Sequence, residues 1–328
     1  MASILTNAAA MAALQTLRSI DRNMETTQAR VSSGLRVETA ADNAAYWSIA
    51  TTMRSDNRAL STVQDALGLG AAKVDTAYAA MDKAIEVVQE IKAKLVAAYG
   101  VGADRSKIQE EINQLQDQLK SISESASFSG ENWLQEDISD GAVPPTPVTV
   151  TKQVVASFIR NASGTVGVTT VDYPLNEDTV LFDTSGGNLG ILDKLATSGA
   201  TSLGFSVVTL DITDLDTVAA QLDIADPPGP HDDVDALDAM TQFVDGQLEA
   251  MTSAASSLGS IQSRIDMQED FVATLIDTID TGVGRLVDAD MNEESTRLQA
   301  LQTQQQLAIQ SLSIANTNSQ NILQLFQQ

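Results

Sequence analysis

The chain of 328 residues has no cysteine, seven prolines and few aromatic side chains, at 4%. Without cysteine, a fold held by disulfides and a thiolate zinc site are both excluded. All the prolines lie between Pro144 and Pro230, so two long flanks contain none. The scarcity of aromatics beside abundant Ala, Gln, Ser and Thr favours helix packing through small and aliphatic side chains over a large enzyme core.

Basic side chains are also scarce: 19 Lys and Arg stand against 44 Asp and Glu, for a net charge of −25. Phosphate binding needs clustered Lys and Arg, so neither nucleic acid nor an anionic membrane is expected as a partner. Residues 136–235 hold 16 acidic against three basic side chains, whereas residues 1–17 hold no charge. The simplest interpretation of the acidic stretch is a solvated surface.

Long apolar runs are missing as well. No stretch reaches 18 apolar residues, so no membrane-spanning helix is expected. The start lacks the basic leader of a signal peptide, and the first basic residue is Arg18. These features indicate a soluble protein of the cytosol, or one exported by a route that uses no cleaved leader.

The proline-free flanks carry apolar residues at alternating steps of three and four, which predicts long amphipathic helices. The first covers about residues 2–31, the longest covers 49–98, and another covers 108–126. After the prolines, helical spacing resumes over 237–279 and again over 298–326. The run over 49–98 is a seam of seven heptads in which only Asp56 and Gly70 are off type.

Local residue patterns predict where these helices begin and end and what lies between the prolines. Gly100 and Gly102 predict the end of the long helix, and Ser106 with Gln109 is typical of a capping box. Gly282 with Gly284 predicts an interruption. Between the prolines, strands are predicted at Val148–Ile159, Thr165–Val171, Thr179–Phe182 and Phe205–Ile212, and short helices at Leu189–Ala196 and Leu215–Leu222.

The two flanks have seams of similar length, and each seam needs an apolar partner. Antiparallel pairing of the flanks is the economical solution. The predicted fold is therefore mainly α: an elongated antiparallel coiled coil or helix bundle formed by the N- and C-terminal flanks, with an inserted α+β outer domain.

A search for reactive groups finds no active site. The single histidine, His231, lies in a proline-rich loop and is expected to be solvated, without a partner. Asp211, Asp214 and Asp216 lack the spacing and the glycine of a calcium loop. The paired glycines lack the rest of a phosphate-binding motif. No enzyme activity, cofactor or metal is predicted.

The last 31 residues, Leu298–Gln328, hold no charged side chain. A solvent-facing helix normally carries charge on its outer face. The tail is therefore either buried core of a single subunit or a surface for self-association. A lone helix of this kind is only marginally stable, which favours self-association.

Several motifs, taken in order, resemble bacterial flagellin: Ile4–Asn7, Val31–Val37 with Ala40–Ala45, Phe128–Leu134, Val287–Asp290 and Gln320–Phe326. The resemblance covers residues 1–140 and 235–328. It rests most strongly on Ser33, Gly34, Leu35, Arg36, Asp42 and Asn43.

The resemblance implies a subunit that self-polymerises into the flagellar filament for swimming. Residues 1–40 with 287–328 would form an inner tube, 41–140 with 232–286 a surrounding helical shell, and 141–231 the outer surface. The tube contacts would come from the helix seams: Ile4, Leu14, Leu17, Ile20, Met24, Val31, Leu298, Leu301, Leu312, Ile322 and Phe326.

The resemblance also implies a location and partners. The chain would be exported unfolded and assembled at the tip of an extracellular filament. Its partners would be identical or related flagellins, the flagellar export apparatus with its chaperone, the filament cap and the hook–filament junction proteins.

Three positions depart from the family pattern where immune receptors read flagellins: Tyr46, Trp47 and Glu90. These departures predict altered recognition and leave the filament role untouched. Two alternatives remain open. One is a hook–filament junction protein, which shares the terminal pattern; the other is a coiled-coil adhesin or scaffold unrelated to motility.

Overall fold

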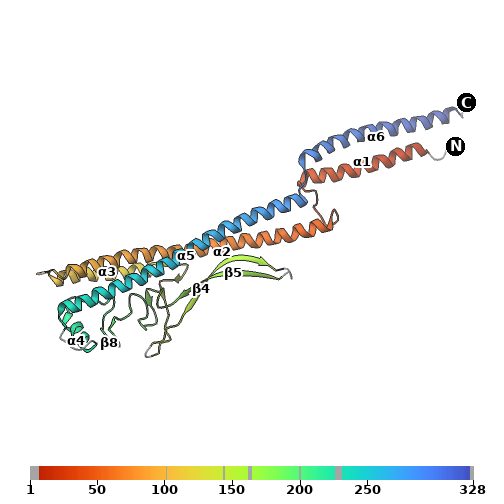
Figure 1. The fold of residues 1–328 in the computed structure, drawn as a ribbon. Helices are drawn as coiled ribbons and strands as arrows, with labels where there is room; N and C mark the ends of the chain where they lie inside the picture. Colours follow the sequence, from red (N-terminus) through yellow and green to blue (C-terminus); the bar gives the residue numbers. More distant parts are fainter. Residues whose placement is uncertain are drawn as a thin grey trace. The chain divides into compact units, whose positions relative to one another are not determined.

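The computed structural model describes residues 7–100, 102–142, 145–161, 165–198, 201–225 and 231–325. The chain is mainly helical, as predicted, and Figure 1 shows the order of its elements. It divides into two compact units: Met1–Ala59 with Leu275–Gln328, and Leu60–Thr274. The described helices are α1 (Ala8–Ser33), α2 (Ala44–Ala97), α3 (Arg105–Ser125), α4 (Leu215–Ala225), α5 (Asp233–Val287) and α6 (Met291–Leu325).

In the larger unit, α2 and α5 run antiparallel. Tyr99, just beyond the C-terminal end of α2, donates to Asp238 near the start of α5. Gln262, further along α5, donates to Asp75 in the middle of α2, so the two helices run in opposite directions. From Leu60 onwards the predicted heptad seam of α2 is buried, whereas Ile49 at its start is exposed. An equivalent row on α5 is buried with it: Leu67, Val74, Met81, Val88 and Leu95 on α2, and Val244, Met251, Leu258, Ile265 and Val272 on α5. Helix α3 adds Ile112 and Leu119 to the core of the same unit.

The inserted segment is built around one long hairpin. Strand β4 (Val150–Arg160) pairs antiparallel with β5 (Val166–Leu175), with a bulge between Val155 and Ser157. Both strands were predicted. Tyr173 of β5 stacks on Trp133 at 5.5 Å between ring centroids.

The other strands are two residues long. They are β1 (Ser127–Phe128), β2 (Glu131–Asn132), β3 (Gln135–Glu136), β6 (Phe182–Asp183), β7 (Thr197–Ser198) and β8 (Thr201–Ser202). β1 pairs with β2 and β7 with β8 as small hairpins, while β6 lies parallel to β3. The strand predicted at Thr179–Phe182 is thus only the short β6.

Two predictions in this segment are wrong. Phe205–Ile212 is not a strand, because its backbone bonds to buried glutamines of α3: Gln109 accepts from Ile212 N and donates to the Leu210 carbonyl. Leu189–Ala196 is not a helix, because the N–H groups of Ile191 and Leu192 donate to the carbonyls of Val180 and Leu181. Helix α4 was predicted and is present.

Two predictions at helix ends are also wrong. The Asp104 side chain, which accepts from Lys107 N, caps α3 in place of the expected Ser106–Gln109 box. Helix α5 continues through Gly282 and Gly284 to Val287. Gly282 lies against Met53, whose Cε would be 3.1 Å from an added Cβ, so this glycine serves close packing inside the helix.

Candidate functional site

Helices α1 and α6 lie side by side in the smaller unit and run antiparallel (Figure 1). Asn7 caps α1 by accepting from Ala10 N, and its side-chain amide donates to the Ala315 carbonyl at 3.0 Å. Further along, Gln305 donates to Asp21 at 2.8 Å. Polar contacts near both ends of this stretch therefore hold the two helices together.

The seam between α1 and α6 uses most of the residues that the sequence proposed as contacts in a polymer. Ile20 and Leu301 are buried, and Leu17, Met24, Val31, Leu298 and Leu312 are half-buried. Leu14 is exposed. Ile4 and Phe326 lie outside the described residues, as does the side chain of Ile322. Apart from Leu14, the seam residues whose side chains are described are thus at least half-buried within the subunit.

Apart from Met291 at the start of α6, five of the described large apolar side chains of this pair are left exposed, and we call them the outer apolar set: Met11, Leu14, Leu307, Ile309 and Ile314. Leu307 and Ile314 are 63% and 68% exposed. Of this set, the sequence had proposed only Leu14 as a polymer contact. It missed the others because it followed a single stripe, although the heptad spacing of Leu307 and Ile314 was visible. A groove lined by Ala13, Ile20, Leu307 and Ala308 runs where α1 and α6 meet.

The turn motif at residues 33–36 begins the connection between α1 and α2. Gly34 has a φ of 74° and ends α1, with its N–H donating to the Arg30 carbonyl. Leu35 bridges to Asp288, and Ala289 N donates to the Gly34 carbonyl. Ser33 accepts from Leu35 N through its hydroxyl oxygen.

The rest of the motif continues this structural role. Arg36 donates to the Leu286 carbonyl. Asp42 accepts from the Thr39 N–H, which together with further Thr39 and Glu38 bonds lowers the pKa of its carboxyl. Asn43 accepts from Ala45 N and Tyr46 N and so caps α2. The motif shapes the connection and carries no reactive group.

A small core lies beneath this connection. Val37, Ala50, Val283 and Val287 are buried together, with Leu35, Met53, Ile279 and Leu286 packed around them. Within this unit α2 and α5 therefore hold the start of the connection in place by apolar burial.

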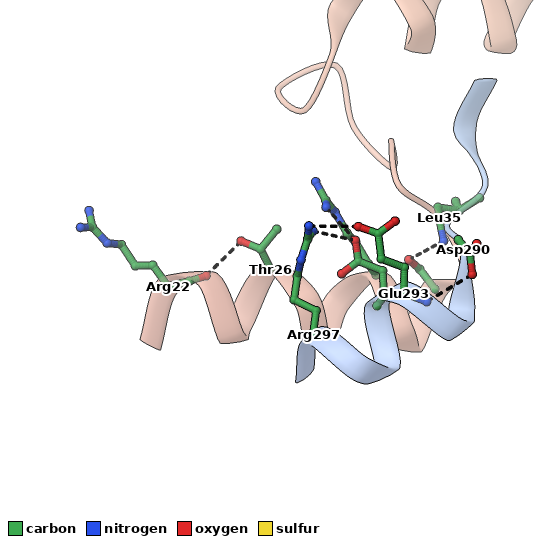
Figure 2. A network of polar contacts seen from close by, with 9 residues as sticks. Arg22, Thr26, Leu35, Asp290, Glu293 and Arg297 are labelled. Atoms are coloured by element: carbon green, nitrogen blue, oxygen red, sulfur yellow. Dashed lines mark hydrogen bonds and ion pairs between the residues drawn. The ribbon is translucent and has the colours of Figure 1, made fainter. Parts of the chain in front are cut away.

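An ion-pair network joins α1 to the start of α6. Arg30 Nη1 lies 3.0 Å from Glu294 Oε1, and Arg297 Nη1 lies 3.4 Å from the same oxygen. Figure 2 shows Arg297 beside Glu293 on α6, with Arg22 and Thr26 on the facing α1. Glu294 is only 5% exposed.

The remaining residues considered from the sequence hold no reactive arrangement. His231 was expected to have no partner, but its Nδ1 lies 2.8 Å from Asp223 Oδ1. Asp211 accepts from Thr213, and Asp214 from Thr217. Within the described ranges, no three His, Asp or Glu side chains gather as metal ligands.

The positions that depart from the immune-receptor pattern are accessible. Tyr46 and Trp47 are 42% and 38% exposed, and Glu90 is exposed on α2. Among the helices that the structure describes, none is both long and apolar enough to cross a membrane.

Comparison with known proteins adds the family context. The model of the bacterial flagellin N-terminal helical region matches residues 4–138, and that of the C-terminal helical region matches residues 241–326. The match thus covers both helical flanks and leaves the hairpin and α4 outside.

Full-length relatives agree. The chain is 55% identical over 335 residues to Flagellin C of Rhizobium meliloti (strain 1021), with 100% of each chain covered. It is 53% identical over 404 residues to Flagellin D of Rhizobium meliloti, again with 100% of each covered. It is 42% identical over 330 residues to a flagellin of Brucella melitensis, with 99% of each covered. The crystal structure of Bacillus cereus flagellin is 16% identical, with a TM-score of 0.33, and covers 64% of this chain and 88% of its own.

Proposed function

We propose that the α1–α6 pair forms the main contacts between subunits of a filament. The premise is that the chain belongs to the bacterial flagellin family. As a flagellin, the chain is a structural subunit of the extracellular flagellar filament, which serves motility, and it is not an enzyme. It polymerises with other flagellins. Full-length relatives that are named flagellins argue against a junction protein or an unrelated adhesin.

The observation that carries the proposal is the outer apolar set. Within one subunit α1 and α6 bury a seam against each other and leave Met11, Leu307, Ile309 and Ile314 in water. Burying a large aliphatic side chain is worth about 1.5–3 kcal/mol. Neighbouring copies would supply that burial, with the groove at Ala13 and Ala308 able to accept a protruding side chain.

The domain division follows from the same reasoning. Residues 1–40 with 287–328 would form the inner tube, 41–140 with 232–286 the shell, and 141–231 the outer surface. The acidic charge of the inserted segment and its position outside both family matches support an outward location. The uncharged ends of the tube segments, residues 1–17 and 298–328, would avoid placing like charges close together at the centre.

Further partners would act during export and assembly of the chain. Export of the unfolded chain through the flagellar export apparatus, with its chaperone, would precede assembly beneath a filament cap and beyond the hook–filament junction proteins. The absence of cysteine suits such a route, because no disulfide has to form or break during passage. Tyr46, Trp47 and Glu90 would alter recognition by flagellin-sensing receptors, and their side chains are accessible to such a receptor in the subunit.

The decisive experiment replaces one exposed apolar residue by a charge. Because Ile314 is 68% exposed, Ile314→Asp should leave the subunit folded, with unchanged circular dichroism. In a polymer the same carboxylate would be buried without a partner, at a cost of several kcal/mol per subunit. We expect seeded polymerisation of purified subunits to fail.

Val166→Asp is the matched control. Val166 is 57% exposed on the hairpin, outside the proposed contacts, so this variant should polymerise normally. Filaments of normal length and yield from Ile314→Asp would show that this part of α6 stays in water, and the assignment of the assembly surface would be wrong.

A further inference from the structure

The apolar seam between α1 and α6 does not by itself specify one alignment. From Leu298 onwards α6 repeats aliphatic, Ala and Gln residues and carries no charge. A slip of one heptad, about 10 Å along the helix, would again set apolar residues against apolar residues. Leu298, Gln305 and Leu312 would simply exchange places.

We propose that Glu294 is a positioning residue that selects one register of α6 against α1 by its ion pair with Arg30. The consequence for assembly rests on the proposed function. One register aligns the exposed residues of α1, such as Met11, with those of α6, such as Ile314, into a single surface for the neighbouring copy.

The geometry that carries this inference is the burial of a charge. Glu294 is 5% exposed, and its Oε1 accepts from Arg30 at 3.0 Å. Its Oε2 is buried and has no hydrogen-bond partner within the described part of the chain. The carboxylate therefore depends on the two arginines that reach Oε1, and only Arg30 comes from the facing helix.

A slip in either direction removes that partner. Arg30 would then face Leu301 or the end of α5, and Glu294 would be left buried with Arg297 alone. Removing one partner of a buried pair is strongly destabilising, because it leaves a charge uncompensated. A single buried polar or charged contact can thereby fix the alignment of paired helices whose apolar packing does not.

A competing explanation lies close by. The Leu35–Asp288 bridge and the bond from Ala289 N to the Gly34 carbonyl already hold the starts of the two helices near each other. If these backbone contacts alone set the register, the charge at Glu294 would be dispensable. The experiment must separate these explanations.

The absence of native cysteine allows disulfide trapping with a clean background. Asp21→Cys with Gln305→Cys reports the native register, because these side chains contact each other at 2.8 Å. Asp21→Cys with Leu298→Cys, or with Leu312→Cys, reports a slip of one heptad. Oxidation of isolated full-length subunits traps whichever pairing the two helices populate, including pairings that open and re-form, so no polymer is needed.

In the unaltered background only the native pair should cross-link efficiently. Glu294→Gln should raise the ratio of slipped to native cross-link by about tenfold or more, and Glu294→Arg further. Arg30→Glu combined with Glu294→Arg should restore the native ratio. Glu293→Gln is the control, because Glu293 pairs with Arg297 at the surface, with its side chain 67% exposed.

Polymerisation is the second readout. Glu294→Gln subunits should polymerise poorly when seeded with filament fragments, and the charge-swapped double variant should polymerise normally. Native cross-links at control level in both Glu294 variants would assign the register to the backbone contacts and overturn the inference. Slipped cross-links beside normal filaments would overturn its link to assembly, without affecting the test at Ile314.

Discussion

Gly70 of α2 lies directly against Val154 of β4: a Cβ added to Gly70 would come within 2.1 Å of the Val154 Cγ1 atom. This glycine is one of two off-type positions, with Asp56, in an otherwise apolar heptad seam. The hairpin packs onto the helix where the helix has no side chain. A position that weakens the helix thus positions the inserted segment.

We expect Gly70→Ala to destabilise the protein although alanine favours helix by about 1 kcal/mol. The methyl group must displace a β-branched side chain that has little room to rotate, and overpacking of this kind costs about 1–3 kcal/mol. Urea unfolding measures the change. Combining Gly70→Ala with Val154→Ala should recover part of the loss. Equal destabilisation in the single and the double variant would contradict the contact.

The carboxyl group of Asp193 should make stability depend on pH. Burial raises its pKa from 3.8 to about 6. Its Oδ2 accepts from Asp183 N, and its buried Oδ1 has no partner among the described residues. Because the folded state holds the proton more tightly than the unfolded state, this group favours folding most below pH 3.8. That contribution falls as the pH rises through 6.

Asp193→Asn removes the charge and keeps the shape. We expect it to unfold at a higher urea concentration than the native protein at pH 7.5, and at nearly the same concentration at pH 4. Asp178→Asn, at an exposed position for comparison, should show no such difference. A variant less stable than the native protein at pH 7.5 would show that the carboxylate is satisfied when charged.

Hydrogen exchange should separate the two units of the isolated subunit. The described side chains of α1 include only two buried ones, Ile20 and Thr27, whereas α2 buries a whole seam. Few buried contacts mean a small free energy of local opening. Amides of α1 and α6 should therefore exchange much faster than those of the α2–α5 pair in the larger unit. In filaments, α1 and α6 should become protected. Strong protection of α1 in verified monomers would mean that the pair is stable without neighbours.

The sequence predicted the long helices well because their signal is local and repeated. Over 49–98 each heptad places apolar residues at the same two positions, so one off-type residue such as Gly70 does not change the prediction of a helix. The β4–β5 hairpin was predictable for a similar reason, since Val-rich runs are dense on both strands. The neutral tail favoured self-association, and the motif around Gly34 carried the resemblance to the family.

Only the tertiary structure decided the features that depend on distant partners. Phe205–Ile212 has the composition of a strand, but the Gln109 side chain takes up its backbone groups. Gly282 suggests a helix break, but packing against Met53 keeps it inside α5. Periodicity places Leu301 on the seam of α6 and Ile314 off it, but only the structure shows that the first is buried and that the second is left 68% exposed. Periodicity shows which residues can share a face, whereas the neighbour that covers a face is set by long-range packing, which no local pattern encodes.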